Sequence, residues 1–289
     1  DRISQLIARE VDAIIIASAQ PTSALAGVPR KECPFIFMDQ TQPVPGAKCV
    51  STDFQAAVSL AVRHLLGHGY TNIAMLSGKA DDGLSDKRIQ GWYQAHKETE
   101  IPVGPVVQAH FTRQGGYDAT LALLDSDHRP DAIFADSDLE AIGALRALHE
   151  RHVRIPEDIA IVSFDGTVDS QFSWPALTVV QQDATAIAER MFQAALDPQN
   201  TPDLQLIDTT LVPRQSCGCL NSNDSPEGIT ANGSLLRSCR LYRRPLSLRL
   251  PMPPMLVMRI LNQQRFCHSW LVADAITPIT PQPWQNRCC

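Results

Sequence analysis

Short apolar runs of strand length recur along residues 1–218, and a segment with helical spacing follows most of them. The runs are apolar at consecutive positions, as expected for strands that helices cover on both faces of a sheet. They span residues 13–17, 35–38, 73–76, 106–107, 132–135 and 159–162. Apolar side chains at three- and four-residue spacing predict helices around residues 57–65, 139–148 and 187–194. Strands that alternate with helices predict an α/β fold with doubly wound parallel sheets.

Polar side chains collect after the ends of these runs, where open α/β sheets bind their ligands. The polar residues are Asp39, Ser77, Asp136, Ser137, Asp138 and Asp165, and they are accompanied by Gly78 and the aromatic Phe111. Carboxylates accept hydrogen bonds from hydroxyl groups, and an aromatic ring covers the apolar face of a sugar. The pattern therefore predicts a site for a small hydroxylated molecule. The alternative is that these are ordinary polar loop residues, which is the more frequent case for any single position.

Motifs for cofactor chemistry and nucleophilic catalysis are absent from the sequence. Neither G-x-G-x-x-G nor G-x-x-x-x-G-K-[ST] occurs, which argues against an enzyme that uses a nucleotide cofactor. The G-x-S-x-G motif is also missing, so an α/β-hydrolase would have no recognisable serine. We assign no catalytic residue and no cofactor.

Two histidines and two cysteines of the chain are candidate metal ligands. His64 and His68 are four residues apart on a predicted helix with a possible cap at Asp53, but the pattern supplies no third ligand. Gly67 and Gly69 predict the end of that helix, where a histidine complements exposed carbonyl groups. The sequence Cys217-Gly218-Cys219 lacks the C-x-x-C spacing of redox and zinc motifs. We therefore predict no metal site.

Charge divides the chain after Gly218. Residues 1–218 carry 17 Lys and Arg against 28 Asp and Glu, a net charge of −11, whereas residues 219–289 carry 8 Arg, no Lys and 3 acidic residues, a net charge of +5. The Arg- and Pro-rich tail is typical of a disordered extension or of a shifted reading frame. Its rival interpretation is a small basic module that binds nucleic acid or membrane. The basic cluster would then be Arg237, Arg240, Arg243 and Arg244.

Taken in order, the segments of residues 1–218 resemble the effector-binding part of the LacI/GalR (lactose-repressor) family of bacterial transcription regulators. In the first half, the carriers are Val11-Asp12-Ala13-Ile14, Phe37-Met38-Asp39, His64-Leu65-Leu66-Gly67-His68-Gly69, Asn72-Ile73-Ala74-Met75-Leu76-Ser77-Gly78 and Arg88-Ile89-Gln90-Gly91-Trp92. In the second half, they are Pro130-Asp131-Ala132-Ile133-Phe134-Ala135-Asp136-Ser137-Asp138, Pro156-Glu157-Asp158-Ile159, Ser163-Phe164-Asp165, Pro175-Ala176-Leu177-Thr178 and Leu211-Val212-Pro213-Arg214-Gln215-Ser216. Each segment is weak alone, and the ordered set is specific.

The resemblance implies a two-lobed periplasmic-binding-protein-like (type I) fold, with the effector between the lobes and three crossings of the chain. The effector-binding domain would span residues 1–218. Its first lobe is expected at about 1–77 and 180–203, and its second lobe at about 78–179 and 204–218. Residues 219–289 would form the atypical tail.

Positions that match the family's motifs imply ligand-binding residues. Arg88, three residues before Gly91-Trp92, matches an arginine that binds ligand hydroxyls or carboxylates, a role that suits a planar fork of donors. Phe111 matches an aromatic residue that stacks on the ligand. Asp165 matches an acid that accepts a hydrogen bond from it.

Further candidates have a less direct match. Ser137 stands where many relatives have Asn, so its contact would be shorter and the effector different. Asp138 is expected to cap the helix that follows it. Asp39 and Asp53 are candidate ligand-binding residues on the first lobe.

The resemblance implies a ligand sensor that does no chemistry on its effector, which is expected to be a carbohydrate. A homodimer would respond to effector by altering how it binds operator DNA. Family members contact DNA through a helix-turn-helix, which we do not find before Asp1, and we expect no operator binding by this mode. The first strand of the family's first lobe is not found either, so we expect one edge of the strand at 14–16 to be unpaired.

Two other functions are alternatives to regulation. A sugar-binding protein of a transport system has the same fold and would differ in what precedes this region. An enzyme on a doubly wound sheet would need a nucleophile or cofactor loop that the sequence does not show. Isolated Cys33 and Cys49 favour a reducing compartment, so we predict a cytoplasmic protein with no membrane partner.

Overall fold

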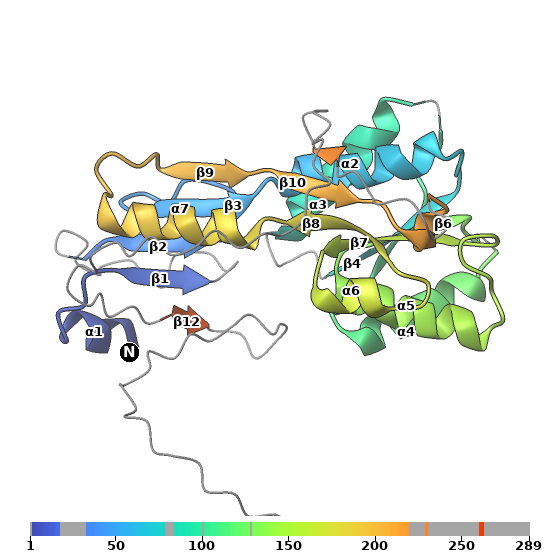
Figure 1. Cartoon of the computed structure of the whole chain (residues 1–289), viewed down its shortest axis with the longest axis horizontal. Coiled ribbons are helices and arrows are strands. Elements are labelled where there is room, and N and C mark those ends of the chain that lie inside the picture. The colour runs from blue at the N-terminus through green and yellow to red at the C-terminus, as the bar shows by residue number, and fades with distance from the viewer. Residues whose placement is uncertain are drawn as a thin grey trace, which may run out of the picture.

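Two β-sheets, each flanked by helices, divide the chain into two lobes (Figure 1). The computed structural model describes residues 2–17, 33–78, 84–99, 101–127, 129–219, 229–230 and 260–262. We call the lobe with the first strand lobe 1 and the other lobe 2. The predicted α/β class with largely parallel sheets is confirmed.

The sheet of lobe 1 has five parallel strands in the order β12-β1-β2-β3-β9. Their bounds are Ile14–Ala17 (β1), Phe35–Met38 (β2), Lys48–Thr52 (β3), Leu204–Ile207 (β9) and Ile260–Asn262 (β12). In β1, Ile14 and Ile16 share a core with Leu6 of α1 (Arg2–Ile7), whereas Ile15 packs with Ile187 of α7 (Ala184–Leu196). Alternate residues of the strand therefore contact different helices, which explains why the run is apolar throughout.

The sheet of lobe 2 has the order β11-β10-β8-β7-β6-β4-β5. Its strands are Ile73–Ser77 (β4), Val106–Gln108 (β5), Ala132–Ala135 (β6), Ala160–Asp165 (β7), Thr178–Gln182 (β8), Thr209–Val212 (β10) and Ile229–Thr230 (β11). All neighbours are parallel except β10, which runs antiparallel to β8 and β11. One core contains side chains of α2 (Phe54–Gly67) and α3 (Leu84–Lys97), and the other contains side chains of α4 (Arg113–Leu124) and α5 (Asp138–Glu150). A short helix α6 (Val168–Phe172) and a 3-10 turn η3 (Gln215–Cys217) complete this lobe.

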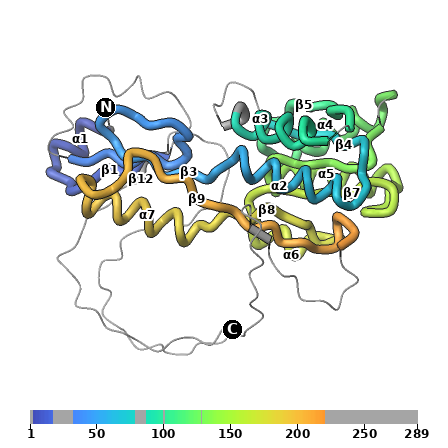
Figure 2. The backbone as a smooth tube through the Cα atoms, turned by 90° about the horizontal axis from the view of Figure 1, so that it is seen from above, coloured from blue at the N-terminus to red at the C-terminus, as the bar shows by residue number. Residues whose placement is uncertain are grey.

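Among the described residues up to Cys219, the chain crosses between the lobes three times, at Asp53, Asp183 and Asp208, as the resemblance implied (Figure 2). The boundaries differ from those expected. Residues 54–77 form α2 and β4 of lobe 2, not part of lobe 1, whereas β9 belongs to lobe 1. The reason is that the sequence pattern of a strand followed by a helix is the same whether the helix packs on the sheet of that strand or on the other sheet. The apolar face of α2 packs against the strands of the other sheet.

Caps define where the helices begin. The predicted cap of α2 is confirmed, because the Asp53 carboxylate accepts a hydrogen bond from the Ala56 backbone N–H at 3.0 Å. The predicted cap of α5 is wrong: Ser137, and not Asp138, is the N-cap, and its hydroxyl accepts from the Glu140 N–H at 3.2 Å. Ser137 and Glu140 have the S-x-x-E spacing of a capping box, and Asp138 is the first helical residue.

Two short pieces of the tail belong to the sheets. Strand β12 pairs in parallel with β1, with Ile260 beside Ile15, so the edge of β1 that we expected to be unpaired is covered. Strand β11 pairs with β10 and forms one edge of the lobe 2 sheet. These residues therefore form strands where we expected disorder, and the disordered or frameshifted tail otherwise stays a prediction. Apart from these strands and Cys219, the tail, including the basic cluster at Arg237–Arg244, lies outside the described residues. Among the described helices, none is long and apolar enough to cross a membrane.

Candidate ligand-binding site

An ion pair between Arg88 and Asp136 lies at the carboxyl end of the lobe 2 sheet. Arg88 projects from α3, and its Nε lies 2.9 Å from Oδ1 of Asp136, which directly follows β6. Both side chains are buried, with 7% of Arg88 and none of Asp136 exposed. The second carboxylate oxygen of Asp136 accepts from the Ser77 hydroxyl at 3.0 Å and the Gly78 N–H at 3.4 Å. The pair therefore fixes the Arg88 guanidinium against the ends of two adjacent strands.

Three aromatic rings surround the same guanidinium. The carbon at its centre lies 4.6 Å from the ring centroid of Phe54, 4.8 Å from that of Phe164 and 5.3 Å from that of Phe111. These distances are those of cation–π contacts, which gain strength where water is excluded. Gly78 makes room for the Phe111 ring, because a Cβ at that position would lie 1.9 Å from Phe111 Cε2.

Two carboxyl groups near Arg88 are held in their protonated form. Burial raises the pKa of Asp165 to about 8, with a further increase from Asp138, and Arg88 and a hydrogen bond from Gln182 oppose the rise. Burial and the charge of Asp136 raise the pKa of Glu140 to about 8, against the opposing charge of Arg88. At neutral pH both groups therefore carry a proton that a hydrogen-bonding ligand can use.

Asp39 brings lobe 1 to the same site. It directly follows β2, and burial raises its pKa to about 6, while the positive charge of Arg88 opposes the rise. Because Arg88 belongs to lobe 2, this interaction acts between the lobes. A chain of hydrogen bonds also joins the lobes here: Thr52 of β3 donates to Gln182 at 2.6 Å, and Gln182 donates to Asp165 at 2.9 Å.

Backbone strain marks three of the predicted ligand residues. Asp39, Phe111 and Asp165 have positive φ angles of 65°, 35° and 111°, a region that residues other than glycine seldom adopt. Such conformations cost about 1–3 kcal/mol each and concentrate at functional sites. Each of these side chains is half-buried, so part of its surface faces solvent beside the fully buried Asp136.

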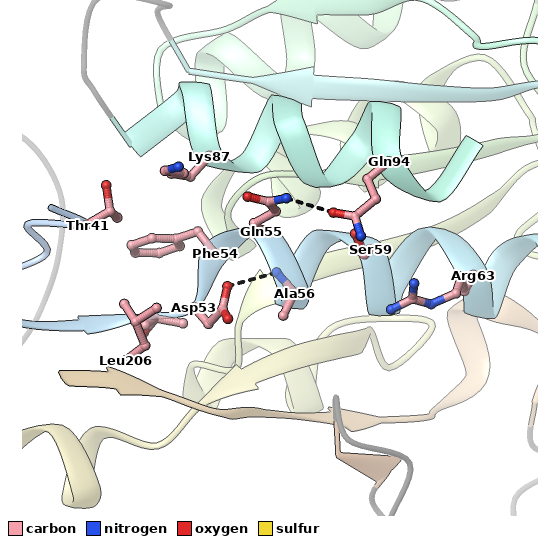
Figure 3. Close-up of a pocket in the computed structure, with 11 residues that line it drawn as sticks. Thr41, Asp53, Phe54, Gln55, Ala56, Ser59, Arg63, Lys87, Gln94 and Leu206 are labelled. Atoms are coloured by element: carbon pink, nitrogen blue, oxygen red, sulfur yellow. Dashed lines mark hydrogen bonds between the residues drawn. The ribbon is translucent and has the colours of Figure 1, made fainter. Parts of the chain in front are cut away.

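A pocket of about 410 Å³ opens beside this cluster, between the lobes (Figure 3). Thr41, Thr52 and Leu206 line it from lobe 1. From lobe 2 it is lined by Asp53, Phe54, Gln55, Ala56, Ser59, Arg63, Lys87 and Gln94, and Gln55 donates to Gln94 across it at 2.7 Å. Phe54 contributes both to this pocket and to the rings around Arg88. Phe54 is therefore shared by the wall of the pocket and the charged cluster.

The structure brings together most of the residues predicted to bind ligand. Arg88, Phe111, Asp165 and Asp39 gather around one guanidinium, while Asp53 lies on the wall of the adjacent pocket. The Ser137 hydroxyl is engaged in capping α5 and in donating to Glu140 at 3.2 Å.

Sequence reasoning missed four members of the cluster. They are Phe54, Asp136 as the ion-pair partner, Glu140 and Phe164. A signal was available for Asp136, which directly follows a predicted strand. For Glu140 the only signal was its place in the capping box, where a buried carboxyl is not expected.

Burial raises the pKa of Asp138. Its carboxylate accepts a hydrogen bond from the Ser163 hydroxyl at 2.6 Å. It also accepts from the Thr167 backbone N–H at 2.6 Å and from the Thr167 hydroxyl at 2.7 Å. It therefore fixes the loop after β7, which contains Asp165. Its role is to position this loop and not to cap α5.

The comparisons agree with this architecture. Residues 62–217 match the model of the family described as periplasmic binding protein-like domain. The transcriptional regulator GalR of Streptococcus thermophilus is 32% identical over 234 residues, which cover 74% of this chain and 68% of that protein. The chain belongs to the LacI/GalR family of transcription regulators.

Two further similar proteins agree with this assignment. The transcriptional repressor PurR of Klebsiella pneumoniae is 30% identical over 205 residues, and the match spans 68% of this LacI/GalR-family chain but 59% of the repressor. A solved LacI-family regulator from Enterococcus faecium with bound ribose has a TM-score of 0.67 at 27% identity, covering 76% of this chain and 84% of that one. The two lobes therefore form the type I periplasmic-binding-protein fold. The names of these relatives describe regulators and not enzymes.

Proposed function

We propose that this chain is the ligand-sensing domain of a LacI-type transcription regulator, and that its effector is a small, neutral, polyhydroxylated molecule such as a sugar. The effector would lie between the lobes, against Arg88, Phe111 and Asp165 of lobe 2 and Asp39 of lobe 1. Asp53 and Ser137 would contribute from the edge of the site. The family and its type I fold support a sensing role. The charges and aromatic rings around Arg88 support the class of effector.

The observation that carries the proposal is the balance of charge around Arg88. Four carboxyl groups, those of Asp39, Asp136, Glu140 and Asp165, interact with this one cation. With Glu140 and Asp165 protonated, the carboxylates of Asp136 and Asp39 face the single charge of Arg88, so an anionic effector such as a sugar phosphate would meet no unpaired positive charge there. Hydroxyl groups both donate and accept, so they match ionised and protonated carboxyls alike. The exposed part of Phe111 would cover the apolar face of a sugar ring.

The relatives favour regulation over transport, because those named are transcription regulators. In the whole protein, closure of the lobes on effector would change how a homodimer presents its DNA-binding segments to an operator. The acidic segment 1–218, with its net charge of −11, has no phosphate-binding character of its own. This role implies a cytoplasmic protein.

A thermal-shift screen tests the proposal. We expect a neutral pentose, hexose or disaccharide to raise the melting temperature, since a ligand at 100 times its Kd stabilises by about 2.7 kcal/mol. Sugar phosphates and purines should have no effect. A shift with these compounds alone would contradict the class of effector and leave the sensing role intact, whereas no shift with any of them would contradict the sensing role. Arg88→Ala is unsuitable as a control, because it also leaves Asp136 without its cation.

A further inference from the structure

Two histidines and two cysteines from distant parts of the chain converge at the end of α2. His64 Nε2 lies 3.3 Å from Cys217 Sγ and 3.4 Å from Cys219 Sγ, and His68 Nε2 lies 3.0 Å from Cys219 Sγ. These four donor atoms all lie within 4.8 Å of one another. The cluster lies at the opposite end of α2 from Phe54, so it is separate from the proposed effector site.

Local structure aims the four side chains at one point. His64 occupies the last turn of α2 and His68 is its C-cap residue, and a spacing of four residues places both rings on one side of the helix. Cys217 ends η3, and Gly218 turns the chain with a φ of 89° before Cys219. This left-handed glycine lets both sulfur atoms of Cys217-Gly218-Cys219 approach the two rings, although the spacing is too short for a C-x-x-C motif.

The geometry matches that of tetrahedral zinc. Zn–S bonds of about 2.3 Å and Zn–N bonds of about 2.0–2.1 Å place sulfur about 3.6 Å from nitrogen across a tetrahedron. The three sulfur–nitrogen distances given above, 3.0–3.4 Å, are 0.2–0.6 Å shorter than this value, and all four donor atoms lie within 4.8 Å of one another. Two thiolates with two imidazoles form a borderline-soft set, which selects Zn²⁺ over the oxygen-seeking Mg²⁺ and Ca²⁺.

We propose that His64, His68, Cys217 and Cys219 form a structural zinc site. All four ligands come from the protein, which is the pattern of structural and not catalytic zinc. The prediction of no metal site considered the histidine pair and the cysteine pair separately, since nothing in the sequence places residues 64 and 217 side by side.

Neighbouring groups support such a site. The Thr178 hydroxyl lies 3.0 Å from Cys217 Sγ, and the Tyr70 hydroxyl donates to the Cys217 carbonyl at 3.3 Å. Groups of this kind orient metal ligands from outside the coordination sphere. Cys217 is fully buried whereas His68 is exposed, which gives the ion a path from solvent.

A bound ion would join the end of α2 to the segment that follows η3, at Cys217–Cys219. The two attachment points are about 150 residues apart in sequence, at residues 64–68 and 217–219. The ion would therefore hold the segment Cys217–Cys219 against α2, the first helix of lobe 2.

Cobalt binding to the full, untagged and reduced chain tests the proposal. We expect the thiolate-to-Co²⁺ charge-transfer absorption and the strong visible bands of tetrahedral Co²⁺, both abolished by Zn²⁺. His68→Ala and Cys219→Ser should each weaken Co²⁺ binding at least about 100-fold, since each removes a direct ligand. His149→Ala, at the exposed end of α5, is the matched control and should leave binding unchanged. Both ligand positions are at least partly exposed, so their variants should fold.

The tail contains four further cysteines, at positions 239, 267, 288 and 289, so the variants must also separate the two sources of thiolate. Changing these four to Ser should leave the absorption intact. The proposal is overturned if the wild-type chain shows no charge-transfer band, if the band survives at full strength in His68→Ala or Cys219→Ser, or if it disappears with the four tail cysteines. As a second readout, a chelator should lower the melting temperature of the wild type and not that of His68→Ala.

Discussion

The guanidinium of Arg88 lies 2.9 Å from the carboxylate of Asp136, with both side chains buried among aromatic rings at the ends of parallel strands. The carboxyl groups of Asp165, Glu140 and Asp39 lie near this ion pair, and the charge of Arg88 opposes the rise in the pKa of each. A buried pair of this kind contributes more to the shape of a site than to stability, although breaking it is costly.

Asp136→Ala is expected to reduce the free energy of unfolding by about 3–5 kcal/mol, because it leaves the Arg88 charge buried without a partner. Arg113→Ala is the matched control: its ion pair with Asp169, at 3.2 Å, is exposed on both sides, and its loss should cost less than about 1 kcal/mol. Urea denaturation monitored by circular dichroism measures both changes. Equal losses in the two variants would contradict the central place of the buried pair.

Stability is expected to fall as pH rises from 6.5 to 8.5. Asp165 and Glu140 each have a pKa near 8 in the folded chain, well above the unfolded value of about 4, so the folded state holds protons that the unfolded state has lost. This contribution is complete below pH 4 and disappears as pH rises through 8. His64, with a pKa lowered to about 4, acts in the opposite direction only below about pH 6.5.

Urea denaturation at several pH values measures this slope, and the change across the window should be about 2 kcal/mol for each group, or about 4 kcal/mol for the two. Asp165→Asn removes one titrating group and should make the profile flatter. Asp169→Asn, an exposed change on α6, should leave the slope as it is in the wild type. Stability that stays level or increases between pH 6.5 and 8.5 would be incompatible with protonated carboxyls at the site.

Gly143→Ala should destabilise the fold by about 1–3 kcal/mol, because a Cβ at Gly143 of α5 would lie 1.9 Å from the Arg113 carbonyl of α4. The close contact of these helices positions Phe111 and Glu140, whose backbone N–H and carboxylate are 3.1 Å apart. Gly67→Ala is the control, since a Cβ there meets nothing within 4 Å and a helix prefers alanine by about 0.5–1 kcal/mol. Thermal melts of the two variants should move in opposite directions, and a neutral Gly143→Ala would refute the tight contact.

Ser137→Ala should cost about 1 kcal/mol of stability through the loss of the α5 cap. Thr112→Ala, which removes the cap of α4, provides a comparison of the same size. Denaturant midpoints report both. If Ser137→Ala is as stable as the wild type, the hydroxyl contributes nothing as the cap of α5.

The strands with uninterrupted apolar runs were predictable from the sequence, because helices cover both of their faces. β2 and β6 have the predicted bounds, and β1 and β4 differ by a residue at one end. β3, β8, β9 and β10 mix polar with apolar side chains, as in Lys48-Cys49-Val50-Ser51-Thr52, and period alone did not distinguish them from loops.

The candidate site was predictable in outline and not in its electrostatics. Strand ends identified Asp39, Phe111 and Asp165, since the carboxyl ends of parallel strands share one edge. The burial of Glu140 and the stacking of Phe54 on Arg88 depend on packing between α2, α3 and α5, which no local pattern encodes. The approach of His64 to Cys217 is also tertiary, and composition and spacing gave no signal for it.

The most direct test of the effector site is a calorimetric titration with the neutral sugar that stabilises the wild type most in the screen. Phe111→Ala and Asp165→Asn should each weaken its binding at least about 10-fold, which corresponds to about 1.4 kcal/mol, while the exposed Tyr93→Ala on α3 should bind as the wild type does. Unchanged affinity in both site variants, with their folds intact, would contradict the assignment of the site.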